Sequence, residues 1–257
     1  IQGNEIHVLY TTTPELPYDS LIEEFDCEFV EQHDFFQDLE RIVKTNPSTF
    51  TWFLVDDLIF RDSFSLRRVE QFMSTNKAID TFSFRLGQHI SDGLPPAFDE
   101  PEEGIVAWDT APSLGRTWNY FWDMSSSLYR TEEVLEYFGK CDPRKITFPN
   151  PLESHYYSVM PTYLTGRRSL KSLVKQARFA FSNKSRRIAS WQHSKCFTQG
   201  VNLVANRSID YQESFSPQEL HARMQEGFII DFMSLKEVHI VRPNAGVQHF
   251  RLVKDHA

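Results

Sequence analysis

The chain has 257 residues, of which 40% are hydrophobic and 14% aromatic, which is enough apolar material for one large folded domain. Its formal net charge of -8 argues against a general nucleic-acid-binding protein, because neutralising phosphates requires a basic surface. The three cysteines, Cys27, Cys141 and Cys196, are too few and too scattered for a disulfide framework or a zinc site. We therefore expect a cytoplasmic protein without a signal peptide or an apolar run of the roughly 20 residues that cross a membrane.

The first segments alternate between strand-like and helix-like patterns. Residues 6–10 form a short apolar run that stops at Thr11, Thr12 and Thr13, which predicts a strand followed by a polar loop. A second run at residues 27–30 precedes apolar residues at helical spacing across positions 35–43. A strand followed by an amphipathic helix is typical of an α/β protein.

The next strand-like run ends in two acids. Residues 51–55 are almost continuously apolar, which predicts a strand covered on both faces in a parallel sheet, and Asp56 and Asp57 follow at once. Ligands of open α/β sheets bind beyond the carboxyl ends of the strands, where two carboxylates can hold Mg²⁺ or Mn²⁺ against a diphosphate. Alternatively, the acids solvate a turn or cap the next helix.

Residues 80–86 alternate between apolar and polar positions after a predicted helix at 66–73. Phe82, Phe84 and Leu86 fall on one face of this strand and Arg85 on the other. Arg85 could therefore pair with a phosphate in a bidentate manner, or form an ion pair with a neighbouring residue at the surface.

The middle of the chain has a long predicted loop and several helix signals. Prolines and glycines across residues 88–118 predict an ordered loop around a short strand at 105–108. Thr131 has the character of a helix N-cap, and Gly139 would end that helix. Near the C-terminus, residues 216–219 match a capping box.

The segment 152–195, which follows the Pro-Asn-Pro boundary at 149–151, is predicted to be helical and is basic. It could bind a diphosphate, an anionic acceptor or a membrane surface, which would make the protein a peripheral membrane binder. Its charges also interleave with apolar residues as in an ordinary amphipathic helix, so a solvated face is the alternative.

The motifs around the two acids occur in an order that resembles GT-A type nucleotide-sugar glycosyltransferases. The matching runs are Phe53-Leu-Val-Asp-Asp-Leu-Ile-Phe60, Phe82-Ser-Phe-Arg-Leu-Gly87, Trp122-Asp-Met-Ser-Ser-Ser-Leu-Tyr-Arg-Thr131 and Asn150-Pro-Leu-Glu153. The chain is most similar to a mostly uncharacterised bacterial group related to the family-two enzymes. The resemblance implies a single α/β domain over residues 1–257 with a mixed, mostly parallel sheet, a donor half at 1–104 and an acceptor half at 105–257.

The resemblance also implies a metal site. Asp56 and Asp57 occupy the place of the family's Asp-X-Asp motif, with Asp57 the direct ligand of Mn²⁺ or Mg²⁺ and Asp56 beside the donor. The third acid of the motif is missing, because the sequence continues with Leu58. His239 matches a place where such enzymes often have a histidine, so we expect it to complete the metal shell. A histidine between apolar residues is otherwise a structural strand residue.

Further positions are expected to bind the donor. Thr11, Thr12 and Thr13 would line the nucleoside pocket, and Asp34 would accept a hydrogen bond from a uracil-like base, which makes a UDP-sugar the favoured donor. Loop solvation and helix capping are the alternatives for these residues.

The acceptor side needs a carboxylate base if the transferase inverts configuration. Asp123 and Glu153 are the candidates, and Trp122 would suit a platform for a sugar ring. The alternatives are a buried tryptophan and a helix-capping acid. Where this chain has Ser125-Ser126, the resembled group tends to have Asp-Gly.

The expected reaction transfers a sugar, a hexose being the favoured case, from a nucleoside diphosphate to a hydroxyl of a carbohydrate or other acceptor, as in polysaccharide biosynthesis. A sugar nucleotidyltransferase is one alternative, although no glycine-rich, lysine-bearing phosphate loop follows the first predicted strand. The other alternative is a non-catalytic GT-A-like module that binds carbohydrate or acts as a scaffold. It is motivated by the shortened acidic motif and the missing Asp-Gly.

Overall fold

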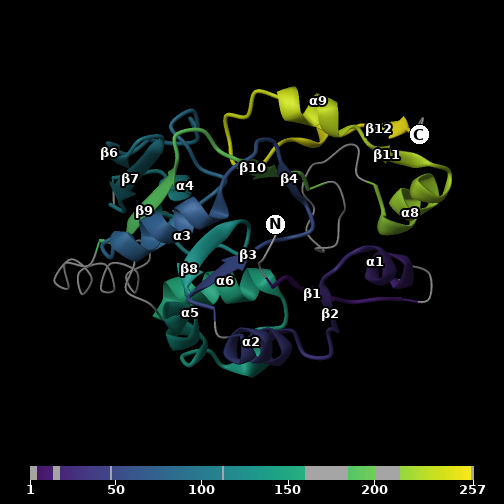
Figure 1. Ribbon diagram of the computed structural model, residues 1–257, viewed down its shortest axis with the longest axis horizontal. Coiled ribbons are helices and arrows are strands. Elements are labelled where there is room, and N and C mark those ends of the chain that lie inside the picture. The colour runs from purple at the N-terminus through teal and green to yellow at the C-terminus, as the bar shows by residue number, and fades with distance from the viewer. Residues whose placement is uncertain are drawn as a thin grey trace, which may run out of the picture.

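The computed structural model describes residues 5–13, 18–46, 48–111, 113–159, 185–200 and 215–255. It shows a mixed α/β protein in which helices flank a six-stranded sheet (Figure 1). In spatial order the strands are β3 (Phe50–Phe53), β8 (Ser127–Arg130), β5 (Thr81–Ser83), β9 (Arg187–Trp191), β7 (Ile105–Asp109) and β6 (Asp99–Glu102).

The strand directions follow from the pairings. Within the described six-stranded sheet only β5 and β9 pair in parallel, and the other neighbouring strands pair antiparallel. Since β8 is antiparallel to both β3 and β5, these two strands point the same way, and β9 and β6 share their direction. The expected mixed sheet is confirmed. Strands β3, β5, β9 and β6 share one direction. Adjacent strands are nevertheless mainly antiparallel, because β8 and β7 run the opposite way and lie between members of this set.

The two faces of the sheet carry two hydrophobic cores. On β8, Leu128 packs into one core and Tyr129 into the other, as the alternation of side chains along a strand requires. In the same way, Ile188 and Ala189 of β9 belong to opposite cores. The sheet therefore lies in the middle of the fold, covered on both sides.

Different helices cover the two faces. Helix α3 (Leu66–Thr75) packs Val69, Phe72 and Met73 against the core that includes Leu128. The other core includes residues of α2 (Phe35–Thr45), α5 (Thr131–Phe138) and α6 (Pro149–Val159). The short elements α4 (Arg116–Asn119) and η1 (Pro143–Lys145) complete this central part of the fold.

Smaller strand pairs lie around the central sheet. β1 (His7–Tyr10) and β2 (Glu28–Glu31) pair in parallel, with α1 (Asp19–Glu24) between them in the chain. β4 (Leu58–Phe60) pairs antiparallel with β10 (Cys196–Thr198). The C-terminal region pairs β11 (Phe228–Ile230) with β12 (Leu252–Lys254) and adds α8 (Pro217–Gln225), α9 (Phe232–Glu237) and η2 (Val247–His249).

The predicted helices at 35–43, 66–73 and after Thr131 are present, and the capping box at Ser216 forms as expected. Thr131 itself does not act as the N-cap. It is the first helical residue, and its hydroxyl lies 2.9 Å from that of Thr51.

Three strand predictions need correction. The strand after residue 50 is not covered on both faces, because β3 is an edge strand, only Phe53 is buried and Leu54 is 41% exposed. Residues 99–102, predicted as loop, form β6 and return into β7 through Gly104, whose φ of 74° favours glycine. Residues 187–191, predicted as helix, form β9.

The six-stranded sheet takes strands from both predicted halves of the chain, so the halves share one sheet. Their division into donor and acceptor functions stays a prediction. None of the helices in the described ranges combines the length and apolar character needed to span a bilayer. All three cysteines are free thiols.

Candidate functional site

Asp57 and Arg85, two predicted site residues, lie at the same end of the sheet because β3 and β5 point the same way. Asp57 follows β3 and Arg85 follows β5, so both lie beyond carboxyl ends of strands. The antiparallel β8 begins at this edge, and Asp123 lies just before it. The backbone amide of Gln199, just after β10, donates to the carbonyl of Asp57 at 2.7 Å.

A buried ion pair joins Arg85 and Asp123. Nη2 of the guanidinium lies 3.3 Å from Oδ2 of the carboxylate, and the two side chains are only 11% and 5% exposed. Nη1 donates to Asn244 Oδ1 at 3.0 Å and to Thr198 Oγ1 at 3.4 Å. Burial acts to lower the pKa of Arg85, but the charge and hydrogen bond of Asp123, together with the charges of Cys196 and Glu153, outweigh it and the pKa is raised. Arg85 is therefore neither a surface arginine nor free of partners.

Asp123 is bound at both oxygens. Its Oδ1 accepts from the backbone amide of Ser125 at 2.8 Å, and its Oδ2 accepts from the hydroxyl of Ser127 at 3.1 Å as well as pairing with Arg85. The carboxylate thus fixes the loop before β8 and orients the guanidinium.

Glu153 reaches the same region from α6. Its Oε1 accepts from the backbone amide of Met124 at 2.7 Å, and its Oε2 accepts from the hydroxyl of Tyr120 at 2.8 Å. Burial, and next the negative charge of Asp123, raise the pKa of Glu153. The two predicted base candidates are therefore neighbours, and the raised pKa means that Glu153 binds a proton more readily than an ordinary carboxylate.

Asp57 occupies a turn between β3 and β4. The amide of Leu58 donates to the carbonyl of Val55 at 3.3 Å, which closes the turn around Asp56 and Asp57. Burial, and next the charge of Asp56, raise the pKa of Asp57, and the charge of Arg85 opposes them. Gly200 lies against the carboxylate, because a Cβ there would be 3.7 Å from Asp57 Oδ2. Asp57 is thus a partly buried acid within electrostatic range of Arg85, while Asp56 is exposed.

Ser126 is a feature of the site that sequence reasoning missed. Its φ is 76°, a left-handed conformation that costs a non-glycine residue energy, and the residue is fully buried. Its amide donates to Phe53 and its carbonyl accepts from Phe84, so it joins the ends of β3 and β5. The signal was available, because the resembled group tends to have glycine at this position.

Tyr18 was also missed. Its ring centroid lies 4.8 Å from that of Tyr10 at the end of β1, and the pKa of Tyr18 is raised by burial and by the charge of Asp56. The end of β1 therefore lies close to the acidic turn. Thr11, Thr12 and Thr13 continue from β1 and are exposed, as a loop beside a binding site would be.

Two predicted binding residues have structural roles instead. Trp122 is 1% exposed and stacks on Tyr156, with 4.9 Å between the ring centroids and an angle of 2° between the ring planes. It therefore cannot offer a platform to a sugar in this structure. Asp34 caps α2, accepting from the backbone amide of Gln37 at 2.9 Å and from its side-chain amide at 3.1 Å. In both cases the structural alternative is the one observed.

His239 does not join Asp57. It follows α9, is exposed, and lies close enough to His89 for its charge to affect the pKa of that residue. The charged groups that affect Asp57 are Asp56 and Arg85. Within the described ranges, no three histidine, cysteine or acidic side chains are arranged to hold a metal ion.

Most of the predicted basic segment, positions 160–184, lies outside the described residues. The described arginines at its end form ion pairs with acids in or next to strands of the central sheet. Arg186 pairs with Asp80 at 2.7 Å, and Arg187 pairs with Asp109 at 3.0 Å and with Asp99.

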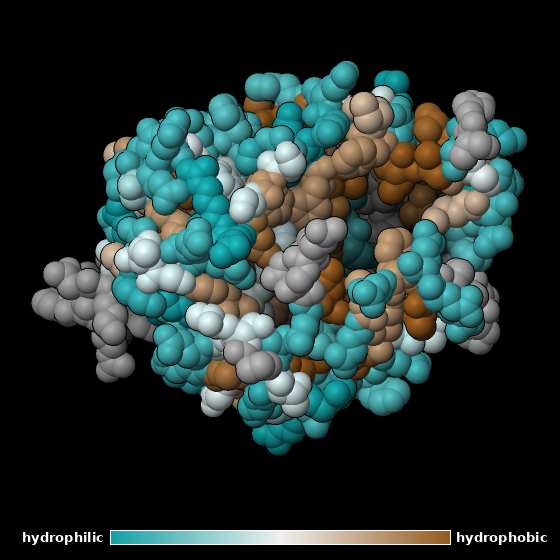
Figure 2. All heavy atoms as spheres, viewed as in Figure 1, coloured by the Kyte–Doolittle hydropathy of each residue, from teal (hydrophilic) through white to brown (hydrophobic). Residues whose placement is uncertain are grey.

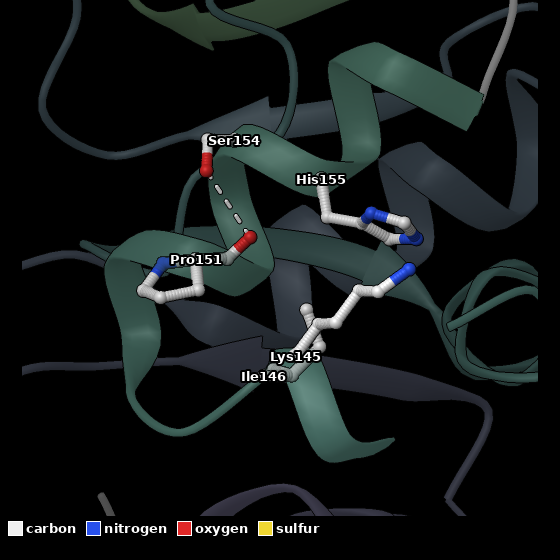
Figure 3. A pocket seen from close by; sticks show the side chains of 5 residues that line it. All are labelled: Lys145, Ile146, Pro151, Ser154 and His155. Atoms are coloured by element: carbon white, nitrogen blue, oxygen red, sulfur yellow. Dashed lines mark hydrogen bonds between the residues drawn. The ribbon is translucent and has the colours of Figure 1, made fainter. Parts of the chain in front are cut away.

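Figure 2 shows a hollow in the face viewed, with hydrophobic residues on its rim. A separate pocket of about 300 Å³ lies between η1 and α6 (Figure 3) and includes none of the predicted site residues. It is lined by Lys145, Ile146, Pro151, Ser154 and His155.

No protein-family model matches the chain, and no curated protein is significantly similar to it. The functional interpretation therefore depends on the geometry of the site.

Proposed function

We propose that the protein is a glycosyltransferase that binds the diphosphate of a nucleotide sugar, through Mn²⁺ or Mg²⁺, at Asp57. The observation that carries this proposal is the position of Asp57, a partly buried carboxylate beyond the carboxyl end of β3 and within electrostatic range of Arg85, which lies beyond the end of β5. This edge of a sheet is where α/β proteins bind nucleotides.

The energetics of Asp57 favour a cation. Removing a carboxylate from water disfavours its charge, and the raised pKa of Asp57 expresses this cost. A divalent cation would offset the cost, and oxygen ligands are those that Mg²⁺ and Mn²⁺ prefer. When bound, the cation would neutralise charge on the leaving nucleoside diphosphate.

Arg85 supports the same role by its charge. The pairing with Asp123 fixes the guanidinium at the edge of the sheet, and its Nε has no partner among the described residues. A positive charge held in place beside the cation would favour a bound diphosphate without further reorganisation.

Tyr10 and Tyr18 suit the nucleoside end. Their rings are adjacent and half-buried, and Tyr18 lies near Asp56, so a base could pack on them while Thr11 to Thr13 contact the ribose or phosphate. This assignment replaces Asp34, whose carboxylate already caps α2.

Glu153 is the better candidate for the base. Asp123 is paired with Arg85, whereas Glu153 forms no ion pair with any described residue and its raised pKa favours proton acceptance once it is ionised. The hydroxyl of Tyr120 orients it.

The experiment is a donor-hydrolysis assay with UDP-sugars and GDP-sugars in the presence of Mn²⁺, measuring release of nucleoside diphosphate. We expect slow hydrolysis of one donor by the native protein and loss of this activity in Asp57→Asn. Asp142→Asn, which changes a half-buried acid paired with Arg144 away from the site, is the matched control. Equal hydrolysis by the Asp57 and Asp142 variants would refute the role of Asp57.

One observation favours the non-catalytic alternative. Both oxygens of Asp123 and both oxygens of Glu153 accept hydrogen bonds from protein groups, so neither carboxylate is free to act without rearrangement. A binding module would bind a nucleotide or sugar without hydrolysing any donor. Donor binding by calorimetry combined with no nucleoside diphosphate release over long incubation would favour the module.

A further inference from the structure

A second group of functional side chains lies at the other end of β4 from Asp57. His89 follows β5, and His193 lies in the connection from β9 to β10. Their ring centroids are 5.6 Å apart, and Ser194 Oγ lies 3.1 Å from His89 Nε2. The two loops are joined by a hydrogen bond from the amide of Gln88 to the carbonyl of Gln192 at 3.0 Å.

Two more segments join these loops. The amide of Ser91 donates to the carbonyl of Val241 at 3.0 Å, which brings the segment that carries His239 beside the His89 loop. The amide of Arg61 donates to the carbonyl of Lys195 at 2.9 Å, which places Arg61 beside the loop that carries His193. Four chain segments therefore contribute side chains that are or can become cationic.

The groups in this cluster carry charges of the same sign when protonated, so they repel one another. Burial, and then the charges of His193, Arg61 and His239, lower the pKa of His89 to about 4. His193 and His239 are exposed, and Arg61 and His89 are half-buried, so the cluster opens to solvent.

Two neighbouring acids pair with other cations. Asp62 pairs with Lys195, and Asp92 lies 3.9 Å from Arg242. The guanidinium of Arg61 donates to the carbonyl of Lys236 at 3.4 Å. Across the described part of the chain, no carboxylate lies within ion-pair distance of Arg61 or of the three histidines.

We propose that Arg61, His193 and His239 form a binding site for a phosphate-type oxyanion, separate from the site at Asp57. A guanidinium and imidazoles supply several N–H donors, and an oxyanion supplies the negative charge that the cluster lacks. The site also explains why His239, which the sequence suggested as a metal ligand, lies among cationic groups.

Strand β4 separates the two sites. Leu58 pairs with Thr198 and Phe60 with Cys196, so Asp57 and Arg61 lie at opposite ends of the same short strand. Four residues of extended chain span roughly 13 Å. One phosphate cannot contact both ends, so the oxyanion site is distinct from the proposed diphosphate site and does not depend on the proposed reaction.

Titration calorimetry with inorganic phosphate, at constant ionic strength maintained with sodium chloride, tests this site. We expect one saturable binding event in the native protein. Binding should be about tenfold weaker in Arg61→Gln and in His193→Gln, because each loses a charge-assisted hydrogen bond. Near-ultraviolet circular dichroism of each variant would show that the fold is kept.

Two controls separate this site from general charge effects. Arg144→Gln removes an exposed arginine outside the cluster and should leave phosphate binding unchanged. Asp57→Asn should also leave it unchanged. No saturable binding by the native protein, equal weakening by Arg144→Gln, or loss of binding in Asp57→Asn would each overturn the proposal.

Discussion

The buried pair of Arg85 and Asp123 predicts a large and specific effect on stability. Arg85→Met leaves the Asp123 carboxylate 5% exposed and without its cation. Breaking a buried pair by removing one partner costs about 3–5 kcal/mol. In a domain of this size each kcal/mol lowers Tm by about 2–4 °C, so Tm should fall by roughly 10 °C.

The double variant isolates the pair. Arg85→Met combined with Asp123→Leu removes both charges, so it should be considerably more stable than the sum of the single effects implies. The assay is thermal and urea unfolding by circular dichroism at neutral pH. Arg144→Met, which removes an exposed arginine from its pair with Asp142, should leave Tm essentially unchanged. A loss under about 1 kcal/mol for Arg85→Met, or additive effects in the double variant, would refute the account of a strongly coupled buried pair.

Three further predictions concern single residues. Asp34→Ala should destabilise the protein by about 1 kcal/mol in urea unfolding, whereas Asp34→Asn should be nearly neutral because asparagine also caps helices. Ser126→Gly should be more stable than Ser126→Ala by about 1 kcal/mol, because only glycine adopts the observed φ of 76° without strain; equal stabilities would contradict the strain. The raised pKa of Glu153 means that its ionised form is disfavoured in the folded state, so the native protein loses stability as Glu153 ionises. Glu153→Gln cannot ionise there, so its stability relative to the native protein should increase as the pH rises from below the ordinary carboxyl range to neutrality. A stability difference that does not change with pH would contradict that shift.

The helices could be predicted because their signals are local. Five apolar residues at helical spacing and a capping aspartate define α2, and a capping box and a first-position proline define α8. The burial of β3 could not be predicted in the same way. An apolar run is the same in a central strand and in an edge strand, and only the sheet order distinguishes them.

The site was predictable only in part. Asp57 could be assigned to the carboxyl end of a strand, whereas Arg85 was predicted within a strand at 80–86 and lies beyond β5, which ends at Ser83. The common direction of β3 and β5 brings the two residues to the same end of the sheet. The pairing of Arg85 with Asp123 depends on the insertion of β8 between those strands, which no local pattern specifies. Trp122 was misassigned because an aromatic residue beside an acid gives the same pattern in a core as at a binding surface.

The most direct test of the central claim is calorimetric titration of UDP, with and without Mn²⁺, into the native protein and Asp57→Asn. The account predicts Mn²⁺-dependent UDP binding that is lost in the variant. It also predicts that the variant unfolds no more easily than the native protein, because asparagine removes a charge that burial disfavours. Mn²⁺-dependent binding that is as tight in Asp57→Asn as in the native protein would contradict the claim, as would no nucleotide binding at all.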